Sequence, residues 1–200
     1  MIIIPRAQIG RSVEIAENVR IDAFSVIGSD AGPITCIQSG AVIGCFCLIE
    51  DGVSLGLGVH IDPYCRISSG TSVGDNSRIL YGAQVFEDVR IGRRCIIGGN
   101  LADRVIVEDN VTHFGETAHS YRIPGSMEEW DNSPQPSAII RSRSVVGQNA
   151  LIIGPVSIGP GAYVSAGEIV RCDVPEDSVF WRGSIKPISD FRGFIQVRSD

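Results

Sequence analysis

Residues 49–79 read IEDGVSLGLGVHIDPYCRISSGTSVGDNSRI and place one aliphatic residue at every sixth position. The same spacing extends from this stretch in both directions and returns near the C-terminus. The full series holds 21 positions, all Ile, Val or Leu: Ile9, Ile15, Ile21, Ile27, Ile37, Ile43, Ile49, Leu55, Ile61, Ile67, Val73, Ile79, Val85, Ile91, Ile97, Ile140, Val146, Ile152, Ile158, Val164 and Val170. A period of six fits neither a single exposed strand nor an amphipathic helix, so it predicts an internal repeat.

The repeat unit has one large and one small inward position. The residue after each aliphatic anchor is often glycine or acidic, and the residue four positions after it is small or β-branched. Each hexad therefore predicts a short strand and a corner, and three hexads close one triangular coil. Coils stacked about 4.8 Å apart form an all-β parallel β-helix solenoid. We expect roughly 7–8 coils over residues 1–183, a protruding loop at about 119–138, and a C-terminal extension over 184–200.

Four residues at the small inward position carry specific expectations. Cys47, Cys65 and Cys95 are predicted to fill the core as small hydrophobes, whereas Cys36, Cys45 and Cys172 fall elsewhere and receive no role. Glu168 takes the same position, where an unpaired buried carboxylate is costly. We therefore expect Glu168 to reach solvent or to pair with a cation such as Arg171.

Composition limits the possible functions. The formal net charge is −6, and the lysines and arginines are scattered, which argues against nucleic-acid binding. The most apolar stretch, residues 34–49, is interrupted by polar residues and is too short to span a membrane. Only Met1 and three isoleucines precede Pro5, so we expect no secretory signal and a cytoplasmic location.

The chain resembles the hexapeptide-repeat acyltransferases over residues 1 to about 183. Residues 15–30, IAENVRIDAFSVIGSD, look like the opening coils of nucleotide-sugar acyltransferases. Residues 145–183, VVGQNALIIGPVSIGPGAYVSAGEIVRCDVPEDSVFWRG, look like the family's closing coils. The resemblance implies a left-handed helix, a homotrimer, and an acyl-CoA, usually acetyl-CoA, in the groove between neighbouring helices. It also implies a histidine general base acting on an amine or hydroxyl of a small acceptor such as a sugar or nucleotide sugar.

The resemblance also implies where the acyl donor binds. Family members hold the CoA arm largely through backbone groups of the closing coils, and the positions that match here are Ala150, Gly161, Ser165 and Ala166. A cation after the last coil often meets the CoA phosphates, which points to Arg182 and Lys186. Residues 181–188, WRGSIKPI, depart from the family pattern, so the phosphate contacts are not assigned more closely.

Two of the chain's three histidines lie in HFGETAH, residues 113–119. If Phe114 is the inward anchor of its hexad, His113 is an extra residue turned outward at a corner and His119 ends the hexad at the next corner. Histidine suits general-base catalysis near neutral pH, so either His113 or His119 is predicted to be the base. Glu116 is the nearest carboxylate that could orient the imidazole, and Asp109 is a second candidate; two plain corner histidines remain the alternative.

A proline-marked excursion follows the histidines. Residues 120–138, SYRIPGSMEEWDNSPQPSA, keep no hexad, and such a long loop is usually functional or disordered. In the family, loops that leave the helix often cover a neighbouring active site. We expect Tyr121 and Trp130 to line the acceptor pocket, with a mobile surface insert as the alternative.

Two other functions fit the same fold. Some hexapeptide-repeat trimers are carbonic anhydrases with three histidines on zinc, and this chain has three histidines. A count of hexads places His60 on the same face as His119 but about three coils away, roughly 14 Å at 4.8 Å per coil, far beyond zinc–nitrogen bonds of about 2.0–2.1 Å. We therefore expect no metal. The third possibility is a non-catalytic scaffold.

Overall fold

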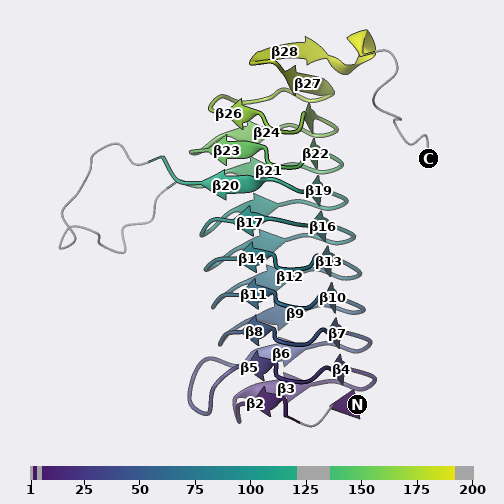
Figure 1. Ribbon diagram of the computed structural model, residues 1–200, viewed down its shortest axis with the longest axis vertical. Coiled ribbons are helices and arrows are strands. Elements are labelled where there is room, and N and C mark those ends of the chain that lie inside the picture. The colour runs from purple at the N-terminus through teal and green to yellow at the C-terminus, as the bar shows by residue number, and fades with distance from the viewer. Residues whose placement is uncertain (1, 4–5, 121–135, 192–200) are drawn as a thin grey trace, which may run out of the picture.

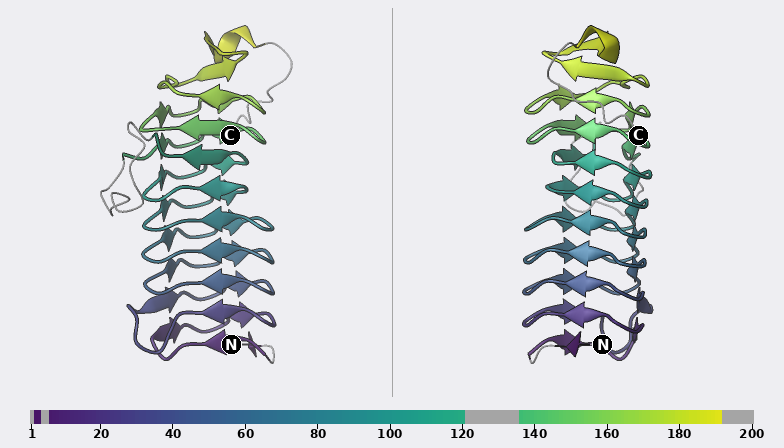
Figure 2. Two further views of the ribbon diagram at one scale, coloured as in Figure 1. Left: turned by 60° about the vertical axis from the view of Figure 1, so that its left-hand side comes forward. Right: turned by 90° about the vertical axis from the view of Figure 1, so that its right-hand side faces the viewer.

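The chain winds into one parallel β-solenoid of about nine turns (Figure 1). The computed structural model describes residues 2–3, 6–120 and 136–191, and it has no α-helix among them. The N-terminal coils lie at one end of the stack and the closing hairpin at the other, as the two side views in Figure 2 also show. The solenoid has more turns than the 7–8 expected, because Ile3, Leu101 and Phe180 also lie on strands that the hexad count omitted.

Three sheets form the three sides of the solenoid. Sheet A has the order β1 (Ile2–Ile3), β4 (Arg20–Ile21), β7 (Val42–Ile43), β10 (His60–Ile61), β13 (Arg78–Ile79), β16 (Ile96–Ile97), β19 (Thr112–His113), β22 (Val145–Val146), β25 (Tyr163–Val164), β27 (Ser178–Trp181) and β28 (Ser184–Pro187). Sheet B has the order β2 (Gln8–Ile9), β5 (Val26–Ile27), β8 (Leu48–Ile49), β11 (Arg66–Ile67), β14 (Gln84–Val85), β17 (Asn100–Leu101), β20 (Glu116–Ala118), β23 (Leu151–Ile153) and β26 (Ile169–Val170). Sheet C has the order β3 (Val13–Ile15), β6 (Thr35–Ile37), β9 (Ser54–Leu55), β12 (Ser72–Val73), β15 (Arg90–Ile91), β18 (Ile106–Val107), β21 (Ile139–Ile140) and β24 (Ser157–Ile158). All pairings are parallel except that of β27 with β28, which a 3₁₀ turn, Ile188–Asp190, follows.

The hexad anchors stack into continuous columns in the core. Ile43, Ile61 and Ile79 are register partners on consecutive coils of sheet A, and all three are fully buried. The residue before each anchor points outward, which is why the two-residue strands alternate between an exposed or half-buried and a buried position. The interior is therefore a narrow aliphatic column, as the repeat predicted.

Two short coils explain where the hexad pattern slips. Leu101 follows Ile97 by four residues and Thr117 follows His113 by four, because the corner between sheets A and B shrinks to two residues in each coil. These corners hold Gly99 and Gly115, which stack on each other and on the coil above. A Cβ at either position would overlap a backbone carbonyl of the next coil, so the short corners require glycine there.

Aromatic residues occupy several corners where glycine or asparagine is more usual. Phe24, Phe46 and Tyr64 have φ values of 62°, 57° and 63°, in the left-handed region that costs a non-glycine residue about 1–2 kcal/mol. Their rings stack in a ladder, with centroids 4.9 Å apart for Phe24–Phe46 and 5.1 Å apart for Phe46–Tyr64. Stacking of about 0.5–1.5 kcal/mol per pair offsets much of the backbone strain.

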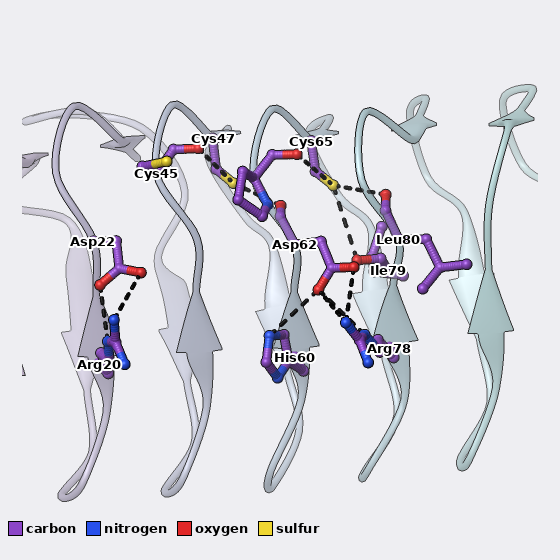
Figure 3. Close-up of polar contacts among 11 residues, drawn as sticks. Arg20, Asp22, Cys45, Cys47, His60, Asp62, Cys65, Arg78, Ile79 and Leu80 are labelled. Carbon is purple, nitrogen blue, oxygen red and sulfur yellow. Dashed lines mark hydrogen bonds and ion pairs between the residues drawn. The ribbon is translucent and has the colours of Figure 1, made fainter.

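The expected core cysteines are confirmed. Cys47, Cys65 and Cys95 are buried, and all six cysteines are free thiols. The Cys47 thiol lies 3.2 Å from the carbonyl oxygen of Asp62, and the Cys65 thiol lies 3.1 Å from the carbonyl oxygen of Leu80 (Figure 3). Each thiol thus occupies the small inward position and contacts the backbone of the next coil.

The solenoid resumes in register after the long excursion. Strand β18 pairs directly with β21, although the chain between them includes β19, β20 and residues 119–138. Glu108 fixes this junction, because its carboxylate accepts hydrogen bonds from Arg141 at 2.9 Å and from the backbone N–H and hydroxyl of Ser142 at 2.9 Å. Tyr121 and Trp130, predicted to line a pocket, lie outside the described residues.

Glu168 confirms the prediction that it is partnered, although its partners are backbone groups. Its two carboxylate oxygens accept hydrogen bonds from the backbone N–H groups of Arg182 at 2.6 Å and Gly183 at 3.2 Å. These N–H groups belong to the tight turn between β27 and β28. Glu168 therefore fastens the closing hairpin to the last full coil.

Candidate active site

A cleft opens at the corner where the chain passes from sheet B to sheet C, beside the start of the long excursion. Its volume is about 710 Å³. Nine residues from three stacked corners line it: His119, Ser120, Ile153, Gly154, Pro155, Val156, Arg171, Cys172 and Asp173. The cleft thus combines an apolar wall with one imidazole, one guanidinium and one carboxylate.

His119 lies deep at one side of this cleft. Its side chain is 8% exposed, and Nε2 lies 3.7 Å from Oδ2 of Asp103, one coil below. Strand register explains the approach: Asn100 pairs with Glu116, so the residues two positions after Leu101 and Thr117 stack on each other. A carboxylate beside one ring nitrogen favours the proton on that nitrogen and leaves the other as the basic one.

Asp103 is the carboxylate that sequence reasoning missed. Its Oδ1 accepts a hydrogen bond of 3.0 Å from the backbone N–H of Glu87, on the coil below, which helps to fix the side chain. The signal was present in the sequence: with Leu101 taken as an anchor four residues after Ile97, Asp103 and His119 occupy equivalent corner positions. The irregular segment GGNLADRV, residues 98–105, obscured this shift in the position of the repeat.

His113 does not turn outward as expected. It is fully buried in the sheet A column, between Ile97 and Val146, while Phe114 is 38% exposed instead of serving as the anchor. Neither ring nitrogen has a hydrogen bond of normal geometry within the described part of the chain. Burial lowers the pKa of His113 to about 4, and the Gly115 backbone opposes the shift only in part. Because it lies in the core, the His113 imidazole cannot act as a base on an acyl acceptor at the surface.

The two carboxylates expected to orient the base lie elsewhere. Glu116 is exposed on the outer face of sheet B. Asp109 lies at the corner between sheets C and A, where its Oδ1 accepts a hydrogen bond of 2.7 Å from the backbone N–H of Arg93. Asp103 is therefore the carboxylate beside His119, because stacking across coils, not nearness in sequence, brings the pair together.

His60 lies on a different face from His119, which corrects the hexad count. Figure 3 shows it on the outer face of sheet A, with Nε2 3.3 Å from Oδ1 of Asp62. Arg78 also binds Asp62, with nitrogen–oxygen distances of 3.0–3.2 Å. Among residues 2–3, 6–120 and 136–191, no three His, Cys, Asp or Glu side chains are placed to hold a metal ion. Over the same residues, no helix is long and apolar enough to cross a membrane.

The chain is similar in sequence to part of several known proteins. No protein-family model matches the chain. It is 29% identical over 174 residues to the bifunctional protein GlmU of Shouchella clausii, covering 80% of this chain and 38% of that protein. It is also 29% identical over 177 residues to GlmU of Sinorhizobium fredii, covering 87% of this chain and 36% of that protein. The chain thus spans little more than a third of these relatives.

A solved structure agrees with the fold. The UDP-N-acetylglucosamine O-acyltransferase LpxA of Moraxella catarrhalis superposes with a TM-score of 0.58 at 16% identity, covering 90% of this chain and 70% of that one. The chain is thus similar in sequence to part of GlmU and in fold to this O-acyltransferase.

Four of the positions that family resemblance assigned to the acyl donor gather near the closing hairpin. Ser165 and Ala166 lie at the corner between sheets A and B, and the backbone N–H of Ser165 donates a 3.0 Å hydrogen bond to the carbonyl oxygen of Phe180. Arg182 and Lys186 lie over the Trp181 ring, at 4.4 and 5.5 Å from its centroid. Trp181 was not predicted as a site residue in this hexapeptide-repeat chain, although it directly precedes the expected cation.

Of the other two donor positions, Ala150 lies one coil below at the same corner between sheets A and B, and Gly161 lies at a different corner. The Ala150 side chain is fully buried, and its carbonyl accepts a 2.8 Å hydrogen bond from the Glu116 N–H. Gly161 lies at the corner between sheets C and A, with its N–H bound to the carbonyl of Ser142 at 3.0 Å. Five of the six donor positions therefore lie around the corner between sheets A and B and the closing hairpin, away from the corner that holds His119.

Proposed function

We propose that the chain is an acyl-CoA-dependent acyltransferase that moves an acyl group, most simply acetyl, to an amine or hydroxyl of a small acceptor. The solved structure with the same fold is a UDP-N-acetylglucosamine O-acyltransferase, which supports a sugar or nucleotide sugar as the acceptor class. His119 is the general base. The reaction takes place in the cytoplasm, where acyl-CoA is available.

One observation carries the proposal: His119 lines an open cleft while its Nε2 faces a carboxylate. In the reaction, Asp103 orients the imidazole, and His119 accepts a proton from the attacking amine or hydroxyl. The separation of 3.7 Å is longer than a hydrogen bond, and catalytic contacts of this kind commonly tighten when substrate binds. The tetrahedral intermediate then collapses, the carbon–sulfur bond breaks, and the proton held by His119 passes to the CoA thiolate.

The acyl donor binds along the closing coils in this proposal. Ser165 and Ala166 offer backbone groups, and Arg182 and Lys186 offer positive charge beside the Trp181 ring. Because this group lies at another corner from His119, the donor of one subunit meets the base of a neighbour in a homotrimer. Three subunits side by side bring the two kinds of corner together.

The first test is calorimetric titration of acetyl-CoA, followed by turnover with sugars, amino sugars and nucleotide sugars. We expect binding near one site per subunit. The variant His119→Gln should keep that binding and lose about 10²–10⁴-fold in kcat, the usual contribution of a general base. His60→Gln is the matched control, because His60 lies on the outer face of sheet A and outside the cleft.

Equal loss of activity in His119→Gln and His60→Gln would remove His119 as the base. An absence of acetyl-CoA binding would contradict the proposal as a whole. In that case tightly held zinc in the purified protein would favour the hydratase of the same fold, and no metal would favour the scaffold.

A further inference from the structure

We propose that Cys47 and Cys65 form a modification site for hydrogen peroxide, which oxidises the two thiols to a disulfide between neighbouring coils of the solenoid. The pair lies in the core beneath the corner between sheets A and B, and neither residue lines the His119 cleft. The proposal is therefore independent of acyl transfer. It rests on the stacking of the two residues, the direction of their thiols and their burial.

The two cysteines occupy equivalent positions on consecutive coils (Figure 3). The backbone N–H of Leu48, the residue after Cys47, donates a 2.9 Å hydrogen bond to the carbonyl oxygen of Cys65. Leu48 itself is the register partner of Arg66, the residue after Cys65. Neighbouring parallel strands lie about 4.8 Å apart, so the two Cα atoms fall within the range of about 4.4–6.8 Å that a disulfide spans.

The directions of the two thiols leave one rotation between them and a bond. The Cys47 thiol points to the coil of Cys65, because its sulfur lies 3.2 Å from the carbonyl oxygen of Asp62 on that coil. The Cys65 thiol points onward, with its sulfur 3.1 Å from the carbonyl oxygen of Leu80. Rotation about the Cα–Cβ bond of Cys65 turns its sulfur back to Cys47, and a small approach of the two corners completes the geometry of a disulfide.

The surroundings of the pair favour Cys47 as the thiol that attacks. Interaction with the Cys65 thiol lowers the pKa of Cys47, and backbone groups of Cys65 and Tyr64 act in the same direction against the effect of burial. The same interaction, together with burial, raises the pKa of Cys65. Because the thiolate is the nucleophilic form, Cys47 reacts with the oxidant and Cys65 closes the disulfide.

Burial restricts the oxidant to a small molecule. Each of the two cysteines is 2% exposed, and each directly follows an exposed ring, that of Phe46 or Tyr64, at the outside of the corner. Local opening of this corner is needed before any reagent meets the sulfur atoms. Hydrogen peroxide is small and uncharged and enters through a narrow opening, whereas oxidised glutathione is bulky and charged and needs a wide one.

One molecule of hydrogen peroxide completes the reaction. The Cys47 thiolate attacks a peroxide oxygen, the O–O bond breaks, and the hydroxide that leaves takes up a proton to become water. The Cys65 thiolate then attacks the sulfur of the Cys47 sulfenic acid, the S–O bond breaks, and a second hydroxide leaves and becomes water. The two thiols supply both protons and lose two electrons, and the peroxide is reduced to water.

The test maps the disulfide in the whole chain. Native protein is treated with a small molar excess of hydrogen peroxide, unfolded with an alkylating agent present, and digested with a protease that cuts after glutamate. The cut after Glu50 separates Cys47 from Cys65, which is the only cysteine in residues 51–87. Mass spectrometry should find these two peptides joined through Cys47 and Cys65, and a reducing thiol should release them. Oxidised glutathione should form the same link at least tenfold more slowly.

Cys65→Ala tests the order of attack and suits the core. Ala83 fills the equivalent position on the next coil, where its carbonyl accepts a hydrogen bond from the Arg66 N–H, so alanine fits this column. The variant should form no link to Cys47. Its Cys47 sulfenic acid then persists and should be trapped by dimedone, at least fivefold more than in the unsubstituted chain, where Cys65 consumes it.

Cys95→Ser is the matched control. Cys95 is also buried, and its sulfur lies 3.0 Å from the carbonyl oxygen of Glu108. Its equivalents on the adjacent coils are Ser77 and Val111, so it has no thiol neighbour there. The Cys47–Cys65 link should form in this variant at the rate of the unsubstituted chain.

Three results would each overturn the proposal. The first is that Cys47 and Cys65 remain free after treatment with peroxide. The second is a disulfide that joins Cys65 to Cys36 or Cys45 in place of Cys47. The third is an equal rate with hydrogen peroxide and with oxidised glutathione, because burial would then not select the oxidant.

Discussion

At the residue scale, His113 and His119 have opposite environments although they are six positions apart. His119 lines an open cleft beside a carboxylate, whereas His113 takes a core position that is otherwise aliphatic. A buried imidazole stays neutral because desolvation penalises its charged form. Histidine is thus the proposed general base at position 119 and a core residue at position 113.

The buried His113 makes stability depend on pH. Its pKa is about 4 in the folded chain and about 6.5 when unfolded, so the unfolded state binds a proton first as the pH falls. Stability is therefore complete above about pH 6.5 and declines towards pH 4, with about 2 kcal/mol lost by pH 5. His113→Val should remove this part of the pH dependence, measured as urea unfolding at pH 7, 6 and 5. A wild-type minus variant difference that does not change with pH would contradict this prediction.

At the element scale, single side chains fasten segments that the solenoid alone does not hold. Glu108 joins the coils on either side of the excursion, and Glu168 binds the turn of the β27–β28 hairpin. Hydrogen bonds from backbone N–H groups to a carboxylate are among the stronger ones in proteins. The hairpin covers the end of the stack, so Glu168 also protects the last coil.

We expect Glu168→Gln to loosen the closing hairpin. An amide presents only one acceptor oxygen and no charge to the two N–H groups, which should cost about 1–2 kcal/mol. Hydrogen exchange at the Arg182 and Gly183 amides should then accelerate about tenfold or more. Glu17→Gln, at an exposed corner, is the control and should leave these two amides unchanged. Unchanged exchange in Glu168→Gln would show that the hairpin is held by other contacts.

At the scale of the whole molecule, different edges of the solenoid have different surfaces. The described corners between sheets B and C hold more acidic than basic residues, whereas Phe24 and Phe46, with the neighbouring Val26 and Leu48, expose a continuous apolar strip. Monomeric proteins rarely expose large contiguous apolar patches. Association between copies would cover such a strip and leave the acidic edge free for ligands.

We therefore expect the purified chain to be a homotrimer, in line with the proposed placement of donor and base on neighbouring subunits. Sedimentation equilibrium over a range of concentrations measures this directly. A molar mass of three chains that persists at low micromolar concentration is the expected result. A monomer would require donor and base to meet within one chain, which their separate corners do not favour.

The sequence by itself determined the architecture. Aliphatic residues every six positions leave no other way to bury one side of the chain, because neither a flat strand nor an α-helix collects residues at that spacing. The same pattern correctly predicted the core cysteines and a partnered Glu168. These inferences depend only on which positions face inward, and that is a local property of the repeat.

The tertiary structure decided the site. The phase beyond Ile97 depends on two-residue corners that close only because Gly99 and Gly115 stack without side chains, and the sequence alone did not reveal this shortening. That shortening turns His113 inward and brings Asp103, sixteen residues before His119, to its side. Contacts such as that of Asp103 with His119 are set by the stacking of coils. The repeat period of the sequence cannot predict them where the length of a repeat changes.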